Sequence, residues 1–317
     1  MAKTVVPIFS WLPDGVLPKL SAEFPEMEFV DCQEPAALER HLPQATLTYG
    51  VPPLSSLGNA PKLRWIQLIS AGVPQDLCPI AKAREIVVTN LAGLYGPPIA
   101  EHALSMMTIL ARNLHVVLRN QLQKRWDREV HWTMKDLRGR TLAIVGVGNI
   151  GQSIARLATA YGMRVVGCRR TDQPTPYVDR IYPCKEMKAM LAEGDYVAVA
   201  APLTRHTEGL LGAEEFAAMK RGVVYINVSR GAVAQEPALL AALQSGQVSA
   251  AGLDVFSTEP LPPEHPLWSM PQVIVSPHYC GDTVNDSAQP AQRFARNLHA
   301  WLSNQPLEGL VNCEWGY

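Results

Sequence analysis

The sequence of 317 residues lacks the marks of several large classes of protein. It contains no apolar run of about 18 residues, the length that a membrane-spanning helix needs. No signal-peptide cleavage site follows its short apolar start. Neither sign of charge is in excess, because 28 Lys and Arg against 29 Asp and Glu leave a net charge of −1. Nucleic acid and anionic membranes are therefore not expected partners. These absences predict a soluble, cytoplasmic protein with small ligands.

The six cysteines are scattered and form no recognised pattern. No two are spaced as Cys-x-x-Cys, and none stands near a histidine at zinc-finger spacing. Scattered thiols of this kind are typical of reduced cytosolic proteins. The sequence therefore predicts neither a disulfide framework nor a metal site. It also lacks short repeats and low-complexity segments.

Apolar residues make up 47% of the chain, which is enough for a large core. At about 150 residues per domain, the length predicts two domains. Short β-branched runs alternate with helical stretches, which indicates an α/β fold with parallel sheets. Strands are predicted at 4–9, 28–30, 46–49, 65–69 and 86–89 and, in a second series, at 141–145, 164–168, 196–200, 223–227, 250–255 and 273–276. Helices are predicted at 97–118, 150–161, 184–192, 213–219, 237–245 and 288–302.

A glycine-rich turn follows the predicted strand 141–145. Its glycines have the spacing G-x-G-x-x-G, and an amphipathic helix comes next. The first glycine permits a tight turn, the second lets a pyrophosphate approach the backbone, and the third lets the helix pack on the strand. The helix N-terminus adds unpaired N–H groups and partial positive charge. The alternative is a purely structural turn. We expect a dinucleotide to bind here, at Gly146, Gly148, Asn149, Ile150 and Gly151.

The end of the next strand indicates which dinucleotide is bound. NAD-binding proteins tend to place an acid there for the ribose 2′-OH, whereas this chain has Arg169, Arg170 and Thr171. An arginine can pair with a 2′-phosphate and stack on adenine. NADP is therefore predicted. NAD is the alternative, because a shifted loop would return Asp172 to the ribose, and the two arginines would then be solvated surface charges.

Three polar residues follow three strands of the second series. They are Arg230, Glu259 and His278. Ligands of open α/β sheets bind beyond the carboxyl ends of the strands, and a parallel sheet brings such ends together. Arg230 could bind the carboxylate and ketone of a 2-oxo acid in its fork geometry. His278 could give a proton to the ketone oxygen as hydride reaches the carbon, while Glu259 orients the imidazole and favours its protonated form. Each residue taken alone would more often be a surface or structural residue.

Together these motifs resemble the D-isomer-specific 2-hydroxyacid dehydrogenases, which include glyoxylate/hydroxypyruvate reductases. The resemblance covers most of the chain from about Trp65 onward. The matching segments are 99–104, 137–142, 146–151, 202–207, 227–231, 252–260 and 276–278. Their order and spacing are highly specific to the family.

The resemblance implies a role for each matching residue. Arg230 is matched to the substrate-binding arginine, Glu259 to its acid partner and His278 to the acid/base. Asp254 is matched to the aspartate that contacts the nicotinamide carboxamide, although a strand-end acid is the alternative. Further cofactor contacts are implied for Pro202, Thr207, Val228 and Ser229. The loop Ser70, Ala71 and Gly72 is matched to the backbone that holds the substrate carboxylate, with an ordinary turn as the alternative.

The resemblance also implies the architecture. A Rossmann-type cofactor domain would span residues 98–288, and a flavodoxin-like substrate domain would combine residues 1–97 with 289–317. The active-site cleft would lie between them, with the helix from Pro97 crossing into the cofactor domain and the helix near Ala288 crossing back. Relatives are usually homodimers joined through the cofactor domain.

The activity implied is NAD(P)H-dependent reduction of a small 2-oxo acid such as glyoxylate or hydroxypyruvate to the D-2-hydroxy acid. One alternative is a dinucleotide-sensing, corepressor-like protein, which the lack of long interaction tails disfavours. Another is a phosphoglycerate dehydrogenase-like enzyme, which the lack of a regulatory domain and of a basic residue in 49–53 disfavours. Glu259 argues against formate dehydrogenase, which lacks this acid. Tyr279 and Cys280 replace residues that are often small in relatives, and they either narrow the cleft or pack.

Overall fold

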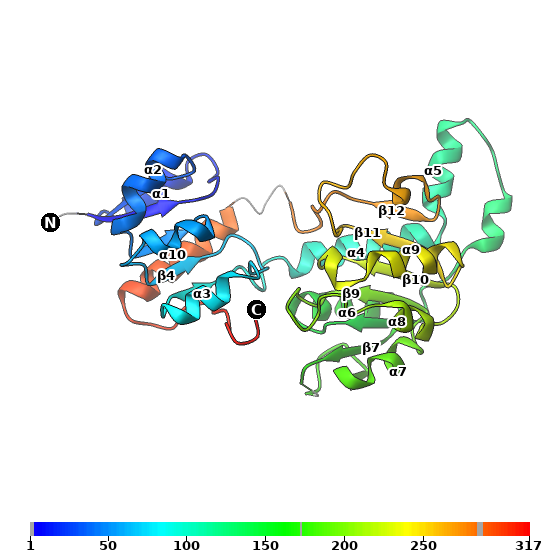
Figure 1. The fold of residues 1–317 in the computed structure, drawn as a ribbon. Coiled ribbons are helices and arrows are strands. Elements are labelled where there is room, and N and C mark those ends of the chain that lie inside the picture. The colour runs from blue at the N-terminus through cyan, green and yellow to red at the C-terminus, as the bar shows by residue number, and fades with distance from the viewer. Residues whose placement is uncertain (1–2, 172, 284–287) are drawn as a thin grey trace. The chain divides into compact units, whose positions relative to one another are not determined.

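The computed structural model describes residues 3–171, 173–283 and 288–317, and the chain divides into two compact units (Figure 1). Unit 1 combines Met1–Leu94 with Thr283–Tyr317, and unit 2 is the continuous segment Tyr95–Asp282. Each unit contains a parallel sheet with helices, so the predicted α/β fold class is confirmed. Asp172, the alternative acid for the ribose, lies outside the described residues.

Unit 1 contains a five-stranded sheet in the order β2-β1-β3-β4-β5, which is the flavodoxin-like order. Its strands are β1 Thr4–Ile8, β2 Met27–Asp31, β3 Leu47–Tyr49, β4 Trp65–Gln67 and β5 Val87–Thr89. Its helices are α1 Val16–Glu23, α2 Pro35–His41, α3 Leu77–Ala83 and α10 Gln289–Leu302, with the 3-10 turns η1 Leu42–Gln44 and η2 Leu54–Asn59.

Helix α10 completes the core of unit 1, although it comes from the end of the chain. Phe294 has no exposed surface, and its ring centroid lies 4.9 Å from that of Tyr49 and 5.7 Å from that of Trp65. Asn297, which is also fully buried, donates its side-chain N–H to the side-chain oxygen Oε1 of Gln67 at 2.9 Å. Burial of a side chain such as Phe294 stabilises a fold by about 1.5–3 kcal/mol. The amino-terminal strands therefore need this carboxyl-terminal helix for a complete core.

Unit 2 contains a seven-stranded sheet in the order β12-β11-β10-β9-β6-β7-β8. The order runs outward from β6 in both directions, as in a doubly wound Rossmann sheet. Its strands are β6 Thr141–Val145, β7 Arg164–Arg169, β8 Arg180–Pro183, β9 Tyr196–Val199, β10 Val223–Asn227, β11 Val248–Leu253 and β12 Val273–Val275. Its helices are α4 Gly96–Ala111, α5 Leu114–Leu122, α6 Asn149–Ala160, α7 Met187–Leu191, α8 Ala213–Ala218 and α9 Glu236–Gln244. Its 3-10 turns are η3 Glu129–Thr133, η4 Cys184–Glu186, η5 Gly231–Val233 and η6 Pro266–Ser269.

The side chains of β6 alternate between two apolar cores. Leu142 and Ile144 pack in the core that includes residues of α4 and α6. Ala143 and Val145 pack in the core that includes residues of α7, α8 and α9. Successive side chains of a strand point to opposite faces, and here both faces are covered. Because both faces of the strand are buried, its sequence is a continuous apolar run.

The prediction of one helix from Pro97 to Leu118 is wrong. The chain breaks between α4 and α5, where Asn113 has a φ of 50° in the left-handed region that asparagine tolerates. Its side-chain N–H donates to the Val130 carbonyl at 3.0 Å and to Thr133 Oγ1 at 2.8 Å. These bonds hold the break in place. The apolar period continues across it, so the sequence pattern does not reveal it.

Most predicted strands differ from the structure by one or two residues at an end, and in addition one strand is missed and one is shifted as a whole. The pattern does not predict β8, a short edge strand that begins with Arg180 and ends with Pro183, because polar residues and proline mask strand periodicity. Strand β11 begins and ends two residues before the predicted 250–255, so Asp254 follows the strand. In the described part of the chain, no helix has the length and apolar character needed to cross a bilayer.

Candidate active site

The carboxyl ends of β10, β11 and β12 stand side by side in unit 2. The register aligns Asn227 with Leu253 and Leu253 with Val275. The segments that follow these strand ends carry Arg230, Glu259 and His278, respectively. The sheet therefore brings the three predicted residues to one edge, as their positions after parallel strands predict.

His278 and Glu259 are in direct contact. Nδ1 of His278 lies 2.6 Å from Oε2 of Glu259, and the other oxygen of that carboxylate accepts the backbone N–H of Phe256 at 2.9 Å. The side chains are 40% and 35% exposed, respectively, so the pair is within reach of a ligand. With Nδ1 held by the carboxylate, Nε2 is the ring nitrogen left to exchange a proton with a substrate.

Arg230 lies directly after the turn that ends β10. Its Nη1 donates to the Ser229 carbonyl at 2.6 Å, and its own carbonyl accepts the side-chain N–H of Asn227 at 3.2 Å. Burial and the adjacent Asp254 raise the pKa of the Cys280 thiol, and the positive charge of Arg230 opposes that rise. Arg230 is therefore within electrostatic reach of the segment that carries His278.

Asp254 holds the segment that carries His278. Its side chain has no exposed surface. One carboxylate oxygen accepts Ser276 Oγ at 2.6 Å and the Tyr279 N–H at 3.2 Å, and the other accepts the Cys280 N–H at 3.1 Å. The resemblance implies that Asp254 contacts the nicotinamide carboxamide. In this conformation the Asp254 side chain is not exposed to a ligand. The predicted contact of Asp254 with the nicotinamide carboxamide stays a prediction.

His102 on α4 also belongs to this cluster, and the sequence reasoning missed its role. Its Nε2 lies 3.1 Å from Ser276 Oγ, and burial lowers the pKa of its imidazole, with Asp254 opposing. Its ring meets that of Tyr279 edge-on, with centroids 5.5 Å apart. Helical spacing could have indicated this position, because His102 lies three residues after the buried Ile99. Tyr279 is 46% exposed despite this packing.

The glycine-rich turn has the geometry that a pyrophosphate needs. A Cβ on Gly146, which has a φ of 96°, would lie 2.5 Å from the backbone of Ala201, and one on Gly151 would lie 2.3 Å from the Gly146 carbonyl oxygen. A Cβ on Gly148 would meet no atom within 4 Å. The first and third glycines thus allow close backbone packing, whereas the second faces open space. Helix α6 begins directly after Gly148, with no side-chain cap on its first N–H groups. These residues fit a dinucleotide.

The arginines expected to select the dinucleotide lie at the end of β7. Arg169 is the last residue of the strand, and its Nη1 donates to Thr175 Oγ1 at 2.9 Å. Arg170 and Thr171 follow and are exposed. Arg169 is thus partly engaged by its own loop, while the segment as a whole faces solvent.

The other predicted cofactor contacts lie after β9 and β10. The Thr207 hydroxyl donates to the Pro202 carbonyl and accepts the Thr204 N–H at 2.8 Å, which closes the turn after β9. Val228 and Ser229 are 2% and 6% exposed, and the Ser229 hydroxyl donates to Asn227 Oδ1 at 3.0 Å. In this structure the hydroxyl groups of Thr207 and Ser229 stabilise the turns, and the Val228 side chain is buried.

The predicted carboxylate loop lies in unit 1, after β4. The Ser70 hydroxyl donates to the Gly72 carbonyl at 2.8 Å, and the Asn90 side chain donates to the Ala71 carbonyl at 2.9 Å. The Leu91 N–H donates to the Ser70 carbonyl at 3.0 Å. The loop is therefore held by bonds to its carbonyl groups and by its own hydroxyl.

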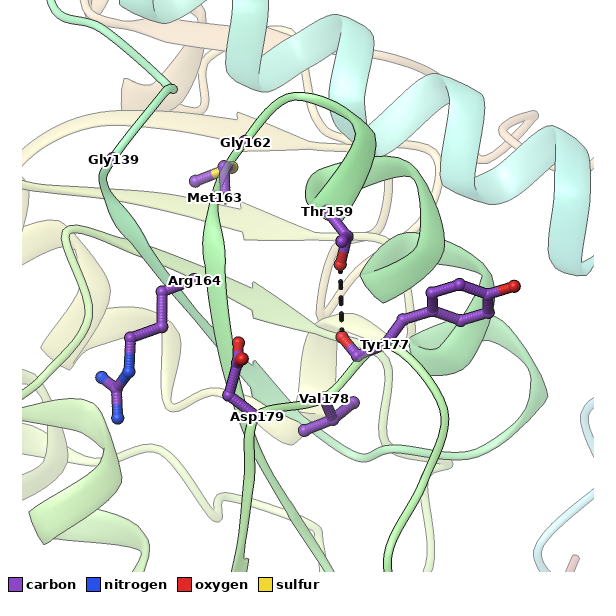
Figure 2. Close-up of a pocket in the computed structure, with 8 residues that line it drawn as sticks. All are labelled: Gly139, Thr159, Gly162, Met163, Arg164, Tyr177, Val178 and Asp179. Carbon is purple, nitrogen blue, oxygen red and sulfur yellow. Dashed lines mark hydrogen bonds between the residues drawn. The ribbon is translucent and has the colours of Figure 1, made fainter.

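An open hollow of about 410 Å³ lies at the opposite edge of the sheet of unit 2 (Figure 2). It is lined by residues at the amino ends of β7 and β8, such as Arg164 and Asp179. The Thr159 hydroxyl donates to the Tyr177 carbonyl at 3.4 Å, and Asp179 accepts the Val165 N–H at 2.7 Å. Because ligands of such sheets bind at the carboxyl ends, this hollow does not belong to the candidate site.

Comparisons with known proteins identify relatives of this chain. The family model described as "D-isomer specific 2-hydroxyacid dehydrogenase, NAD binding domain" matches residues 104–280. A glyoxylate reductase of Korarchaeum cryptofilum is 34% identical over 261 residues, which cover 80% of this chain and 78% of that protein. A glyoxylate/hydroxypyruvate reductase B of Escherichia fergusonii is 30% identical over 320 residues, which cover 98% of each chain.

Solved structures of similar fold include two with bound dinucleotide. A D-isomer specific 2-hydroxyacid dehydrogenase from Xanthobacter autotrophicus Py2, in complex with NADPH and MES, has a TM-score of 0.86 and 27% identity and covers all of both chains. An NADPH-dependent glyoxylate/hydroxypyruvate reductase from Sinorhizobium meliloti, in complex with NADP and sulfate, has a TM-score of 0.87 and 26% identity, and the match covers 99% of this chain and 100% of that one.

We predict that two substitutions in the glycine-rich turn affect different properties, one the stability and the other dinucleotide binding. Gly146→Ala should lower the free energy of unfolding by about 2 kcal/mol or more, because its Cβ would press on the Ala201 backbone and its φ is positive. Gly148→Ala should change stability by less than about 0.5 kcal/mol but weaken dinucleotide binding about tenfold or more. Thermal unfolding and fluorescence titration with NADPH measure the two effects. Equal stability of the two variants would contradict the assignment of the close approach.

Proposed function

Because the chain belongs to the D-isomer specific 2-hydroxyacid dehydrogenase family, we propose that it reduces a small 2-oxo acid with NADPH, either hydroxypyruvate to the D-2-hydroxy acid or glyoxylate to its achiral 2-hydroxy acid. The family itself supports NAD(P)-dependent 2-hydroxyacid dehydrogenase activity. The observation that carries the proposal is the His278–Glu259 pair at the same sheet edge as Arg230. The choice of substrate is supported by relatives that are named glyoxylate and glyoxylate/hydroxypyruvate reductases.

Each residue of this trio has a separate task in the proposed reaction. NADPH, when bound, supplies the hydride that adds to the carbonyl carbon at position 2. Arg230 binds the substrate carboxylate and the oxygen of that carbonyl group. His278 donates the proton on Nε2 to that oxygen and so completes the alcohol, and it takes the proton back in the oxidation direction. Glu259 keeps the imidazole oriented through Nδ1. Arg230 and the imidazolium together stabilise the negative charge that develops on the oxygen.

The dinucleotide would be held by segments of unit 2. The turn from Gly146 to Gly151 would bind the pyrophosphate, and Arg169, Arg170 and Thr171 would bind the 2′-phosphate of NADP. Thr207, Val228 and Ser229 would contribute backbone contacts, because their side chains are buried or engaged in a turn. Pro202, which is exposed, would contribute a further contact. In unit 1, the loop Ser70, Ala71 and Gly72 would bind the substrate carboxylate through backbone N–H groups.

The protein would act as a homodimer joined through unit 2. Large apolar side chains are exposed along α5 and the segment that follows it. Leu118 is 57% exposed, Leu122 85%, Trp126 93% and Trp132 74%. Exposed apolar groups that lie close together along a chain are typical of a surface that another protein covers. A second copy of this chain is the partner that the family implies.

Substitution of His278 tests the acid/base role. His278→Ala should lower turnover of glyoxylate or hydroxypyruvate by about 10²–10⁴-fold, because the proton donor is lost. NADPH binding should survive, as measured by fluorescence titration. His299→Ala, which removes a surface histidine paired with Glu23 at 2.7 Å, serves as the control and should keep normal turnover. Near-normal turnover of the His278 variant in NADPH oxidation assays would refute the role.

Charge reversal at the end of β7 tests the preference for NADP. Arg169→Asp should lower kcat/KM for NADPH about tenfold or more and leave that for NADH unchanged or higher, because an acid repels the 2′-phosphate and accepts the ribose hydroxyl. Arg180→Ala, on the neighbouring strand β8, is the control. An unchanged ratio of the two cofactors would show that another group selects between them.

Polar substitution on the exposed apolar segment tests the homodimer. Leu122→Ser combined with Trp126→Ser should convert the dimer into a monomer while unit 2 stays folded, since neither side chain is buried within the chain. Light scattering after size-exclusion chromatography gives the mass. A wild-type protein that is monomeric at assay concentration would contradict the proposal.

A further inference from the structure

A second histidine–glutamate pair lies within unit 2. His265 Nε2 lies 3.0 Å from Glu236 Oε1, and His265 Nδ1 accepts the Leu267 N–H at 3.3 Å. Because Nδ1 is an acceptor, the ring proton is on Nε2 and is donated to the carboxylate. The side chains are only 14% and 26% exposed, so this pair is better shielded from water than His278–Glu259.

The pair joins the two loops that carry members of the catalytic trio. Glu236 is the first residue of α9, at the end of the loop that begins after β10 and carries Arg230. His265 lies at the end of the loop that begins after β11 and carries Glu259. The hydrogen bond therefore fastens the far ends of the two loops to each other.

The near ends of the same loops meet through their backbones. A Cβ on Gly231 would lie 2.0 Å from the carbonyl carbon of Phe256, so the chain directly after Arg230 lies against the start of the Glu259 loop. The Phe256 N–H in turn donates to Glu259 at 2.9 Å. A displacement of one loop at this contact is thus transmitted to the carboxylate that holds His278.

The space between the two contacts is not fully packed. A hollow of about 20 Å³ is bordered by residues of both loops, among them Gly231, Glu236, Phe256 and Leu267. Such a space has room for about one water molecule. Beside this space, Val233 of the Arg230 loop and Phe256 of the Glu259 loop belong to the same apolar core, so packing holds the loops together as well as the two contacts.

We propose that Glu236 and His265 are positioning residues that fix the Arg230 loop relative to the Glu259–His278 pair. The inference rests on the proposed function, since it concerns the alignment of the arginine with the proton donor. Catalysis is sensitive to such alignment, because a misplacement of about 1 Å can cost about 10²-fold in rate. Val228 and Ser229, which are assigned to the dinucleotide, lie at the end of the Arg230 loop away from Glu236, so cofactor binding is expected to be independent of the pair.

Kinetics of single and double variants test the pairing. Glu236→Ala and His265→Ala should each lower kcat/KM for the 2-oxo acid about tenfold while the Kd for NADPH stays unchanged. The double variant should lose no more than either single variant, because both substitutions remove the same bond. Glu236→Gln keeps an oxygen that accepts from Nε2 and should retain most of the activity. Glu23→Ala, which breaks the surface pair with His299, is the matched control.

Amide hydrogen exchange tests the inference without turnover. Glu236→Ala should speed exchange in both loops, at the Phe256 N–H and at the Val233 and Ala234 N–H groups, whereas Glu236→Gln should not. A lower melting temperature with unchanged kcat/KM and unchanged exchange would indicate a merely structural pair and overturn the proposal. Additive losses in the double variant would overturn it as well.

The two proposals fail in different ways. If the wild-type protein turns over no 2-oxo acid, the proposed function fails. The exchange measurement still shows in that case whether Glu236 and His265 hold the two loops together. If turnover is normal and the alanine variants match wild type in both kcat/KM and exchange, the positioning role alone fails. The Gln variant decides the matter if an alanine variant does not fold.

Discussion

The carboxylate of Asp254 has no exposed surface, and donors from the segment after β12 surround it. A buried carboxylate without partners would be costly, so these bonds fix the segment strongly. They also hold the backbone at His278, whose φ is 54° and whose N–H donates to the Asp254 carbonyl at 2.9 Å. The contact of His278 with Glu259 depends on this fixed backbone, and the proposed proton transfer depends on that contact.

The parallel sheet of unit 2 places the segments that carry the proposed catalytic residues. Its register sets three strand ends side by side, and the glycines allow the segments beyond those ends to approach closely. Gly231 lets the arginine loop lie against Phe256, just as Gly146 lets the glycine-rich turn lie against Ala201. The same structural device thus occurs at the proposed catalytic edge and at the proposed dinucleotide site. At both places the backbone segments approach so closely that a Cβ on the glycine would collide with the neighbouring chain.

Much of the fold could be predicted from the sequence, because strands buried on both faces are continuous apolar runs. The predicted ranges of β6 and β10 agree with the structure residue for residue. The family resemblance is confirmed by the matched family model. The contact between His278 and Glu259 could also be predicted from the sequence, because the two residues follow neighbouring parallel strands. Their roles in the reaction remain proposals.

Other features left no periodic signal in the sequence. The break at Asn113 interrupts a helix without interrupting its apolar pattern. The burial of Asp254 depends on donors that come from another loop. Glu236 and His265 are 29 positions apart, and each alone is an ordinary polar residue near a helix start or a proline. Neither residue directly follows a strand or belongs to a motif that the sequence shows, so reasoning from local pattern does not find their contact.

The assembly of unit 1 from both chain ends has a consequence for synthesis on the ribosome. The strands of Met1–Leu94 emerge first, but α10 with Phe294 emerges only after all of unit 2. The surfaces of Tyr49 and Trp65 that Phe294 covers stay uncovered during that interval. Unit 2 is continuous and can fold while unit 1 waits, which reverses the usual order in which the amino-terminal domain folds first. Unit 1 of the nascent chain therefore has an incomplete core until α10 is made, and exposed apolar surface of this kind favours aggregation and chaperone binding.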